Sequence, residues 1–519
     1  MYPAHFAAST PDKPAVINAS TGQRQTYREL VAGAHRLARL LRDIGLRPGD
    51  HYTILAENHL RYFELVWAGL NTGLYVTPVN SHLTAAEVAY LVNDSDTKVV
   101  IATVALTDLA EEIVALTPGV DRRLMLDGGS ASFESLDEAV SRYSSEPLDD
   151  EVRGTFMLYS SGTTGRPKGI RYPLPDHPAA EGDAALLPMS RALFGFDDNT
   201  VFLSPAPLYH AAPLRVSCLV QCSGGTVVMM PKFDAQAALD AIERFAVTTS
   251  QWVPTMFVRM LKLPAAVRSG YDLSSMRVAV HAAAPCPPDV KARMIDWWGP
   301  IITEYYSGTE NFGTTALSSA EWLDHPGSVG RPVGCVVHIC DENGAELPAG
   351  EIGAVYFEAA GADFSYHNDP ERTAAVAHPT YSGWRTLGDV GRLDADGYLY
   401  LSDRRDFTII AGGVNIYPRE IEDVLILHDE VTDVAVFGVP DPDLGEQVKA
   451  VVQPAQWADV CPELAQRLLA HCRSTLAPYK WPRSIDFTRA LPRQDNGKLY
   501  KKLLRDPYWA PANTPDQTS

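Results

Sequence analysis

The spacing of apolar residues near the N-terminus predicts helices with clear beginnings and ends. Apolar residues from Leu30 to Ile44 recur every three or four positions, as they do on one face of an amphipathic helix. Thr26 and Glu29 form the Thr-x-x-Glu capping box that opens such a helix, and Gly45 closes it. A second capping box begins at Thr84 and predicts another helix.

Short apolar runs between the helical stretches predict strands. We place them at 52–56, 74–79, 98–102, 201–204, 226–230, 249–253, 278–280 and 301–303. Strands that alternate with helices form parallel sheets covered on both faces, so we expect an α/β fold with mostly parallel, helix-covered sheets. Ligands of such sheets bind at the carboxyl ends of the strands.

The pattern changes after residue 404. Helices at 419–427 and 463–476 and strands at 434–439 and 449–452 predict a small α+β unit. The break in composition at Arg405 and Asp406 indicates a hinge before it. We therefore expect a large N-terminal domain over residues 1–404 and a small, mobile C-terminal domain over residues 405–519.

Composition narrows the class of protein. The 519 residues are 46% hydrophobic and 21% charged, an ordinary globular balance, and the length predicts more than one structural unit. A net charge of −20 argues against nucleic acid as a partner. The N-terminus lacks a signal-peptide pattern and no run approaches the roughly eighteen apolar residues of a membrane helix, so we expect a cytoplasmic protein without integral membrane contact. Seven scattered cysteines favour reduced thiols over disulfides or a zinc site.

A loop of small and hydroxyl-bearing residues follows the apolar run 155–159. It reads Ser-Ser-Gly-Thr-Thr-Gly-Arg-Pro-Lys-Gly from Ser160 to Gly169. Glycine lets backbone N–H groups approach an anion closely, and the hydroxyls and Lys168 add donors and charge, so the loop is a candidate phosphate cradle. A flexible surface loop is the alternative. The order of residues does not fit the Walker pattern, which disfavours a P-loop ATPase.

Other polar residues at strand ends have ordinary interpretations when taken alone. His210, between prolines and alanines, is typical of a packed histidine, and Asp389 after a glycine is typical of a turn. Lys232 and Lys498 are typical of solvated surface charges.

The Ser160–Gly169 loop resembles, almost letter for letter, the signature of the adenylate-forming superfamily, which includes acyl- and aryl-CoA synthetases, peptide-synthetase adenylation domains and luciferases. The resemblance runs from about residue 5 to 505 and keeps the family's motif order. Stretches 207–213, 281–287 and 321–332 look like bacterial CoA synthetases for fatty, aryl or bulky alicyclic acids, including bile-acid-type ligases.

The resemblance implies an ATP site. Its phosphate-binding residues would be Ser160, Ser161, Gly162, Thr163, Thr164, Gly165 and Lys168. The adenine loop and the following motif would contribute Ala283, Ala284, Pro285, Tyr305, Tyr306, Ser307 and Thr309. Asp389, with Arg404, would bind the ribose, and Glu310 would bind Mg²⁺.

The resemblance also implies the remaining roles. Catalysis would involve Lys498, Thr309, Glu310 and His210, with Lys498 bridging the substrate carboxylate and the α-phosphate. The acyl pocket would include His210, Ala212, Trp252, Ala282 and Gly308. CoA would meet Lys232, Ala411, Gly412 and Gly413, and Asp406 would lie at the hinge.

We therefore predict an AMP-forming acid–CoA ligase that uses ATP, Mg²⁺ and CoA on a hydrophobic carboxylic acid. One alternative is an adenylating enzyme that passes the acyl group to an amine. An alternative of another class is a nucleotide-binding regulatory protein without catalysis. The identity of the acid is left open, as is whether the chain forms a homodimer.

Overall fold

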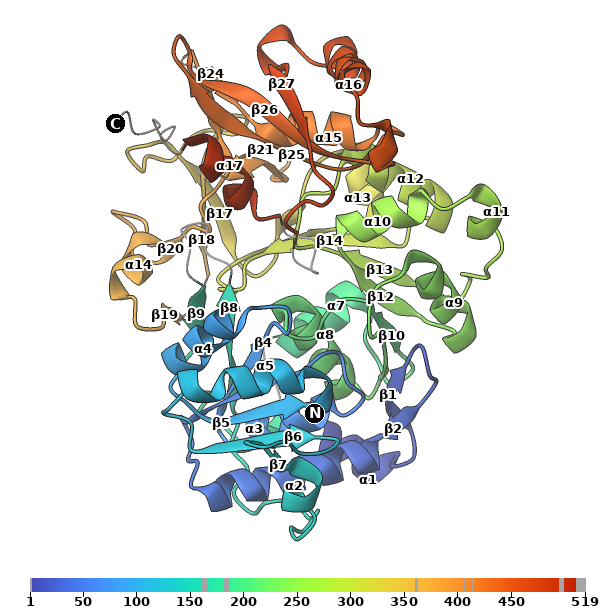
Figure 1. The fold of residues 1–519 in the computed structure, drawn as a ribbon, viewed down its shortest axis with the longest axis vertical. Coiled ribbons are helices and arrows are strands. Elements are labelled where there is room, and N and C mark those ends of the chain that lie inside the picture. The colour runs from blue at the N-terminus through green and yellow to red at the C-terminus, as the bar shows by residue number, and fades with distance from the viewer. Residues whose placement is uncertain are drawn as a thin grey trace, which may run out of the picture.

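A computed structural model describes residues 2–160, 167–181, 186–359, 363–404, 407–412, 414–493 and 499–509. A large N-terminal part contains three sheets, and a small C-terminal part, orange to red in Figure 1, contains a fourth and lies at one end of the molecule. The predicted α/β class, with a large and a small domain, is confirmed. The predicted hinge residues Arg405 and Asp406 lie outside the described residues, so the domain boundary stays a prediction.

The first large sheet has nine strands. From β1 to β14 its neighbouring strands are parallel, and β2, β15 and β16 add antiparallel edges. In spatial order the strands are β16 (Arg331–Pro332), β15 (Thr314–Leu317), β14 (Ile302–Ser307), β13 (Val278–His281), β12 (Thr249–Trp252), β10 (Val201–Ser204), β11 (Thr226–Met229), β1 (Pro14–Asn18) and β2 (Arg24–Thr26).

The second large sheet has eight strands. Its neighbouring strands are parallel from β8 to β7, and β9 and β19 are antiparallel. In spatial order they are β19 (Ser365–Tyr366), β9 (Lys168–Arg171), β8 (Thr155–Ser160), β4 (Tyr75–Val79), β3 (His51–Leu55), β5 (Thr97–Thr103), β6 (Arg122–Leu126) and β7 (Glu134–Ser135).

Two smaller sheets follow along the chain. An antiparallel sheet contains β17 (Val336–Cys340), β18 (Gly353–Glu358), β21 (Asp389–Leu393), β22 (Leu399–Arg404) and β20 (Trp384–Arg385). The C-terminal sheet contains β24 (Val414–Ile416), β23 (Ile409–Ala411), β26 (Gly445–Pro454), β25 (Val431–Asp441) and β27 (Ser484–Phe487), and it is antiparallel apart from the β26–β27 pair.

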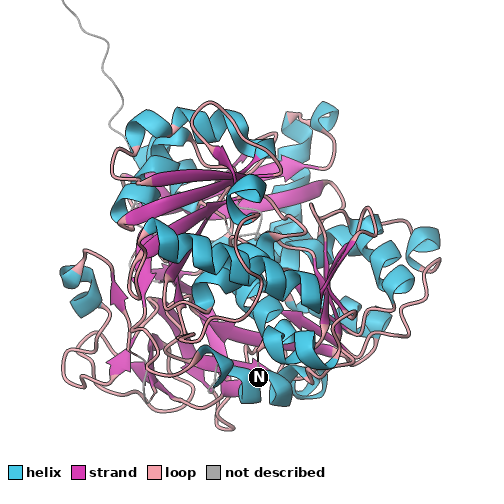
Figure 2. Cartoon of the chain, turned by 90° about the horizontal axis from the view of Figure 1, so that it is seen from below, coloured by secondary structure: helices cyan, strands magenta, loops and turns pink. Residues whose placement is uncertain are grey.

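Helices pack between and around the sheets (Figure 2). In the N-terminal part they are α1 (Pro3–Ser9), α2 (Tyr27–Ile44), α3 (Tyr62–Leu70), α4 (Ala85–Asp94), α5 (Thr107–Glu112), α6 (Leu136–Val140), α7 (Leu186–Phe194), α8 (Ala211–Cys222), α9 (Ala235–Phe245), α10 (Pro254–Leu261), α11 (Ala265–Arg268), α12 (Pro288–Trp298), α13 (Ser319–Asp324) and α14 (Pro370–Ala375). In the C-terminal part they are α15 (Pro418–Ile426), α16 (Pro462–Thr475) and α17 (Lys501–Trp509).

The predicted helix signals are confirmed. Thr26 and Thr84 each complete a capping box with the glutamate three residues later, and Gly45 ends α2 in a left-handed conformation with φ of 110°. No helix in the described ranges is long and apolar enough to cross a membrane.

One hydrophobic core joins the two large sheets. It includes Val16 and Val227 from the first sheet, Ile54 from the second, and Leu37 and Val66 from helices α2 and α3. Because this core is continuous, the two sheets are held at a fixed angle, and the carboxyl ends of strands from both can open onto one site.

A buried charge cluster lies beneath those strand ends. The Lys291 ammonium on α12 is 2.6 Å from a Glu304 carboxylate oxygen on β14, and the His281 ring on β13 is 3.4 Å from the same oxygen. The Lys291 side chain is fully buried. Burial acts to raise the pKa of Glu304, but His281 and Lys291 keep that pKa well below its usual range.

We expect Lys291→Met to destabilise the protein by about 3–5 kcal/mol at neutral pH, because it leaves a buried carboxylate without its cation. Urea unfolding measures the change. The matched control is the double variant Lys291→Met/Glu304→Gln, which removes the stranded charge and should recover most of the loss. A single variant as stable as the wild type would contradict the account.

Candidate active site

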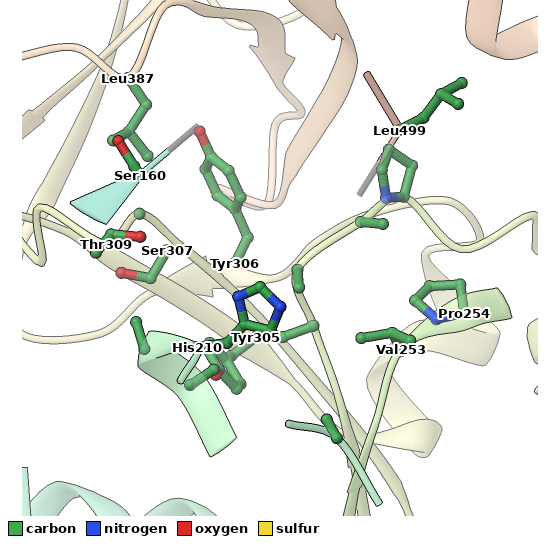
Figure 3. Close-up of a pocket in the computed structure, with 18 of the residues that line it drawn as sticks. Ser160, His210, Val253, Pro254, Tyr305, Tyr306, Ser307, Thr309, Leu387 and Leu499 are labelled. Atoms are coloured by element: carbon green, nitrogen blue, oxygen red, sulfur yellow. The ribbon is translucent and has the colours of Figure 1, made fainter. Parts of the chain in front are cut away.

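The carboxyl ends of parallel strands from both large sheets open onto one cavity of about 940 Å³. Ser160 ends β8, Trp252 ends β12, the turn after Ser307 follows β14, and all of them line the cavity. Asp389 of the antiparallel sheet and Asp433 of β25 in the C-terminal sheet also line it. Leu499 of the C-terminal part lies on the same wall (Figure 3). Four sheets therefore contribute to one site.

A tight turn after β14 forms one polar wall. The Asn311 N–H donates to the Gly308 carbonyl at 3.1 Å, and Asn311 has φ of 52°. A Cβ on Gly308 would lie 2.3 Å from a terminal methyl group of Leu387, so a larger residue there would displace the Leu387 side chain. The Thr309 carbonyl accepts hydrogen bonds from the Tyr172 hydroxyl and, at 3.4 Å, from the Arg215 guanidinium. These bonds fix the direction of the turn.

Glu310 presents a carboxylate beside this turn. Its Oε1 accepts a hydrogen bond of 2.6 Å from the Tyr366 hydroxyl, and the Lys168 ammonium lies 5.0 Å from the centre of the Tyr366 ring. Carboxylate oxygen is a ligand that Mg²⁺ prefers, and one protein carboxylate together with nucleotide phosphates is a usual way to hold it. The residues present therefore fit a nucleotide-bound Mg²⁺.

Asp389 faces the cavity from the antiparallel sheet. The Tyr306 hydroxyl donates a hydrogen bond to its carboxylate, which links β14 to β21. The Tyr306 side chain extends from β14 on the side where Ser160 and Leu387 lie (Figure 3). Arg404 is the backbone partner of Asp389 across β21 and β22. This arrangement places a carboxylate at the polar end of the cavity.

Tyr305 points to the opposite face of β14 from Tyr306, because side chains alternate along a strand. Its hydroxyl accepts a hydrogen bond of 3.0 Å from the Gln251 amide, and its ring centre is 5.9 Å from that of Phe194. Burial raises the pKa of Tyr305 to about 12. The Tyr305 side chain thus lies in the apolar part of the cavity, and its contact with ATP stays a prediction.

Helices α7 and α8 supply the apolar wall. The apolar side chains from these helices that line it are Leu186, Met189, Leu193, Phe194, Val216 and Leu219. His210 is the residue before α8, and its ring centre is 4.5 Å from that of Tyr209. The cavity therefore has a polar end and an apolar end, with His210 on its wall.

The loop after β13 forms another part of the wall. Ala282, Ala283, Ala284 and Pro285 line the cavity, and Ala283 has φ of 74°, in the left-handed region that favours glycine. The small side chains leave room for a flat group against the loop.

Comparison with known proteins decides the family. The model described as AMP-binding enzyme matches residues 4–362, and the model described as AMP-binding enzyme C-terminal domain matches residues 420–498. The chain belongs to the AMP-binding enzyme family.

Its relatives are mostly named as CoA ligases. Feruloyl-CoA synthase of Amycolatopsis sp is 36% identical over 97% of this chain and 98% of its own length. Long-chain-fatty-acid–CoA ligase FadD13 of Mycobacterium tuberculosis is 31% identical, with 97% of each chain covered. The structure of amide bond synthetase McbA from Marinactinospora thermotolerans has a TM-score of 0.80 and 29% identity, over 98% of this chain and 99% of that one. This AMP-binding enzyme is an adenylate-forming ligase of the CoA ligase branch, and ATP and CoA fit as its substrates.

The structure brings most of the predicted residues to the one cavity of this AMP-binding enzyme. Those that line it are Ser160, Lys168, His210, Ala212, Trp252, Ala282, Ala283, Ala284, Pro285, Tyr305, Tyr306, Ser307, Gly308, Thr309, Glu310 and Asp389. Lys232 is exposed outside it, and Ala411 and Gly412 lie on a C-terminal hairpin that does not line it.

The remaining predicted residues are not described. They are Ser161, Gly162, Thr163, Thr164, Gly165, Asp406, Gly413 and Lys498, together with the side chain of Arg404. The residues that flank the lysine motif, Arg493 and Leu499, both line the cavity.

Sequence reasoning missed several residues of this AMP-binding enzyme's cavity. Arg215, Tyr172, Tyr366 and Gln251 belong to no motif that we recognised, although three of them line the cavity and Tyr172 holds the turn after β14. The sequence could have indicated Arg215 as a candidate site residue, because it is the only charged residue in the twelve-residue helix α8. The tyrosines reach the site by tertiary packing, which local patterns do not report.

Proposed function

We propose that this enzyme activates a hydrophobic carboxylic acid, whether fatty, aryl or alicyclic, as an acyl-AMP and then transfers the acyl group to CoA. The observation that carries the proposal is the two-ended cavity. Thr309, Glu310 and Asp389 gather at its polar end, and apolar side chains of α7 and α8 line the rest. An acid whose carboxylate reaches the polar end leaves its hydrophobic body against α7 and α8.

The polar end suits a nucleotide. Asp389, held by Tyr306, accepts hydrogen bonds from the ribose hydroxyls, with Arg404 assisting. The Ala283–Pro285 loop, Ser307 and Thr309 all line the cavity. The loop would support the adenine, and Thr309 would hydrogen-bond the α-phosphate. Ser160, Lys168 and the loop from Ser161 to Gly165 bind the remaining phosphates.

Glu310 would hold Mg²⁺ together with phosphate oxygens of ATP. When bound there, Mg²⁺ offsets the charge of the triphosphate and of the departing pyrophosphate. Tyr366, through its hydrogen bond to Oε1, orients the Glu310 carboxylate.

Adenylation brings two anions together. A carboxylate oxygen of the acid attacks the α-phosphorus, a new phosphorus–oxygen bond forms, and the bond to pyrophosphate breaks. Lys498 bridges the carboxylate and the α-phosphate and stabilises the charge that concentrates there. His210 stands at the mouth of the acyl pocket, which Ala212, Trp252, Ala282 and Gly308 also line.

The thioester step uses the mobility of the C-terminal domain. Rotation about Asp406 withdraws Lys498 and brings the Ala411–Gly413 hairpin to the site, where small residues leave a narrow path for the thiol arm of CoA. The sulfur attacks the acyl carbonyl carbon, the thiol proton is released to solvent, and AMP leaves with the electrons of the broken carbon–oxygen bond. Lys232, exposed on the N-terminal domain, offers a cation for the CoA phosphates.

A second candidate shares the first step. An amide synthetase would pass the same acyl-AMP to an amine. The similarity to the structure of the amide bond synthetase McbA supports this second candidate. The two functions differ only in the acceptor, so product analysis separates them.

We expect Lys498→Ala to slow ATP–pyrophosphate exchange by about a thousand-fold or more, because a cation at the transition state is lost. Thioester formation from supplied acyl-AMP should be preserved. Lys98→Ala is the control, because Lys98 lies outside the cavity and pairs with Asp50, and it should behave nearly as the wild type. Near-normal exchange in Lys498→Ala would overturn the role of Lys498, and a wild type that shows no exchange with any acid would favour the regulatory alternative.

The acceptor is tested with a competent acid, ATP, Mg²⁺ and either CoA or a panel of amines, with products identified by mass spectrometry. CoA should raise turnover and yield acyl-CoA and AMP. Lys232→Ala should raise the KM for CoA by about two- to five-fold, the effect of an exposed ion pair, and leave the KM for ATP unchanged. Amides in place of acyl-CoA would overturn the second step.

A further inference from the structure

Gln251 and Tyr305 form a polar pair within the apolar wall of the cavity. They lie at the carboxyl ends of β12 and β14, and their 3.0 Å hydrogen bond passes over β13, which lies between the two strands. Both residues line the cavity, and Gln251 is only 7% exposed. Because both residues lie on strands, the sheet and not a loop fixes the positions of their side chains.

The pair leaves one acceptor and one donor unused. Within the described ranges, Gln251 Oε1 is buried and has no hydrogen-bond partner. The Tyr305 hydroxyl accepts from the Gln251 amide, and no acceptor for its own proton is found among the described residues. Buried polar groups are nearly always paired, so an unused donor next to an unused acceptor points to a missing partner.

Apolar side chains surround Gln251 and Tyr305, so the pair is an isolated polar site. Tyr305 lies 5.9 Å from Phe194, centre to centre, and packs against the hydrophobic cluster that also includes Val216. Burial holds the pKa of Tyr305 at about 12, although Gln251 and Arg215 act to lower it, so the phenol keeps its proton at neutral pH. The Tyr305 hydroxyl can therefore donate a hydrogen bond.

The pair is also separate from the nucleotide. Tyr306 points to the polar end and bonds Asp389, whereas Tyr305 points to the other face of the same strand. A group that binds Gln251 and Tyr305 therefore belongs to the hydrophobic body of the acid and not to ATP.

We propose that the acid substrate carries a hydroxyl group on its hydrophobic body, away from the carboxylate, and that Gln251 and Tyr305 determine this specificity. One hydroxyl can donate to Gln251 Oε1 and accept from Tyr305 at the same time. The inference rests on the proposed function and narrows its substrates to acids with a hydroxyl group on the hydrophobic body. A plain alkyl or aryl acid would leave both polar groups unpaired.

The test uses matched pairs of acids that differ only in one group on the body. The probes are cinnamic, 4-hydroxycinnamic and 4-methoxycinnamic acid, together with unsubstituted and hydroxylated benzoic, cyclohexanecarboxylic and long-chain acids. Pyrophosphate release gives kcat/KM for each. In the wild type the preferred acid should be hydroxylated and exceed its unsubstituted and methoxy counterparts by about 10- to 100-fold, the effect of leaving buried polar groups unpaired.

Gln251→Leu should lower kcat/KM for the hydroxylated acid by about 10-fold or more and raise that for the unsubstituted acid, because the leucine no longer leaves a polar group unpaired beside an apolar substrate. Tyr305→Phe should lower the same preference to a smaller extent. Gln236→Leu is the matched control, because Gln236 makes a similar 3.1 Å bond to the Tyr271 hydroxyl on the exposed surface. It should keep the preference unchanged.

The outcomes separate the inference from the function on which it rests. A wild-type enzyme that prefers unsubstituted or methoxy acids, or a Gln251→Leu variant that keeps the preference for hydroxylated acids, would overturn the inference while the ligase function stands. Pyrophosphate release with no acid of the panel would overturn both.

Discussion

The packing of two large sheets against one shared core is the constraint on which the site depends. Valines and leucines of both sheets and of helices α2 and α3 fill that core, and close packing fixes the relative position of the two sheets. The carboxyl ends of β8 from one sheet and of β12, β13 and β14 from the other can then meet at a single cavity. The antiparallel sheet adds Asp389, and the hydrogen bond from Tyr306 ties it to β14.

The cavity holds positively charged side chains although the whole molecule is negatively charged. The chain carries a net charge of −20, yet Lys168 and Arg215 both line the cavity. The Arg215 guanidinium lies 5.0 Å from the centre of the Tyr172 ring and donates to the Thr309 carbonyl, so its position is set before any substrate arrives. Cations held in place within a partly buried site suit a reaction in which a carboxylate must approach a phosphate.

The predictions from the sequence were most accurate where a short run of neighbouring residues determines the structure or the role of a residue. The capping boxes at Thr26 and Thr84, the strand ends, and the motif residues Thr309, Glu310 and Asp389 follow from short patterns, and the structure places those motif residues at one cavity. Predicted strands were too short where continuous pairing extends them. β25 and β26 pair over nearly their whole lengths, and no local pattern reports that partner.

Other features depend on contacts between distant parts of the chain. The antiparallel sheet from β17 to β22 was not among the predicted strands, because β18 pairs with β20 and β21 across a long stretch of the chain. Tyr305 was grouped with its neighbours as a nucleotide residue, whereas strand alternation turns its side chain toward Phe194 and Gln251. Tyr366 reaches Glu310 from a part of the chain 56 residues away.

The central claim is that a carboxylate oxygen of the substrate attacks the α-phosphorus of ATP in this cavity. It is tested most directly by giving the enzyme a competent acid whose carboxylate is labelled with ¹⁸O, together with ATP, Mg²⁺ and CoA, and measuring the label in the products by mass spectrometry. The account predicts that each turnover places one ¹⁸O atom in AMP and leaves the other in the acyl-CoA. Unlabelled AMP, or ADP and phosphate in place of AMP and pyrophosphate, would contradict it.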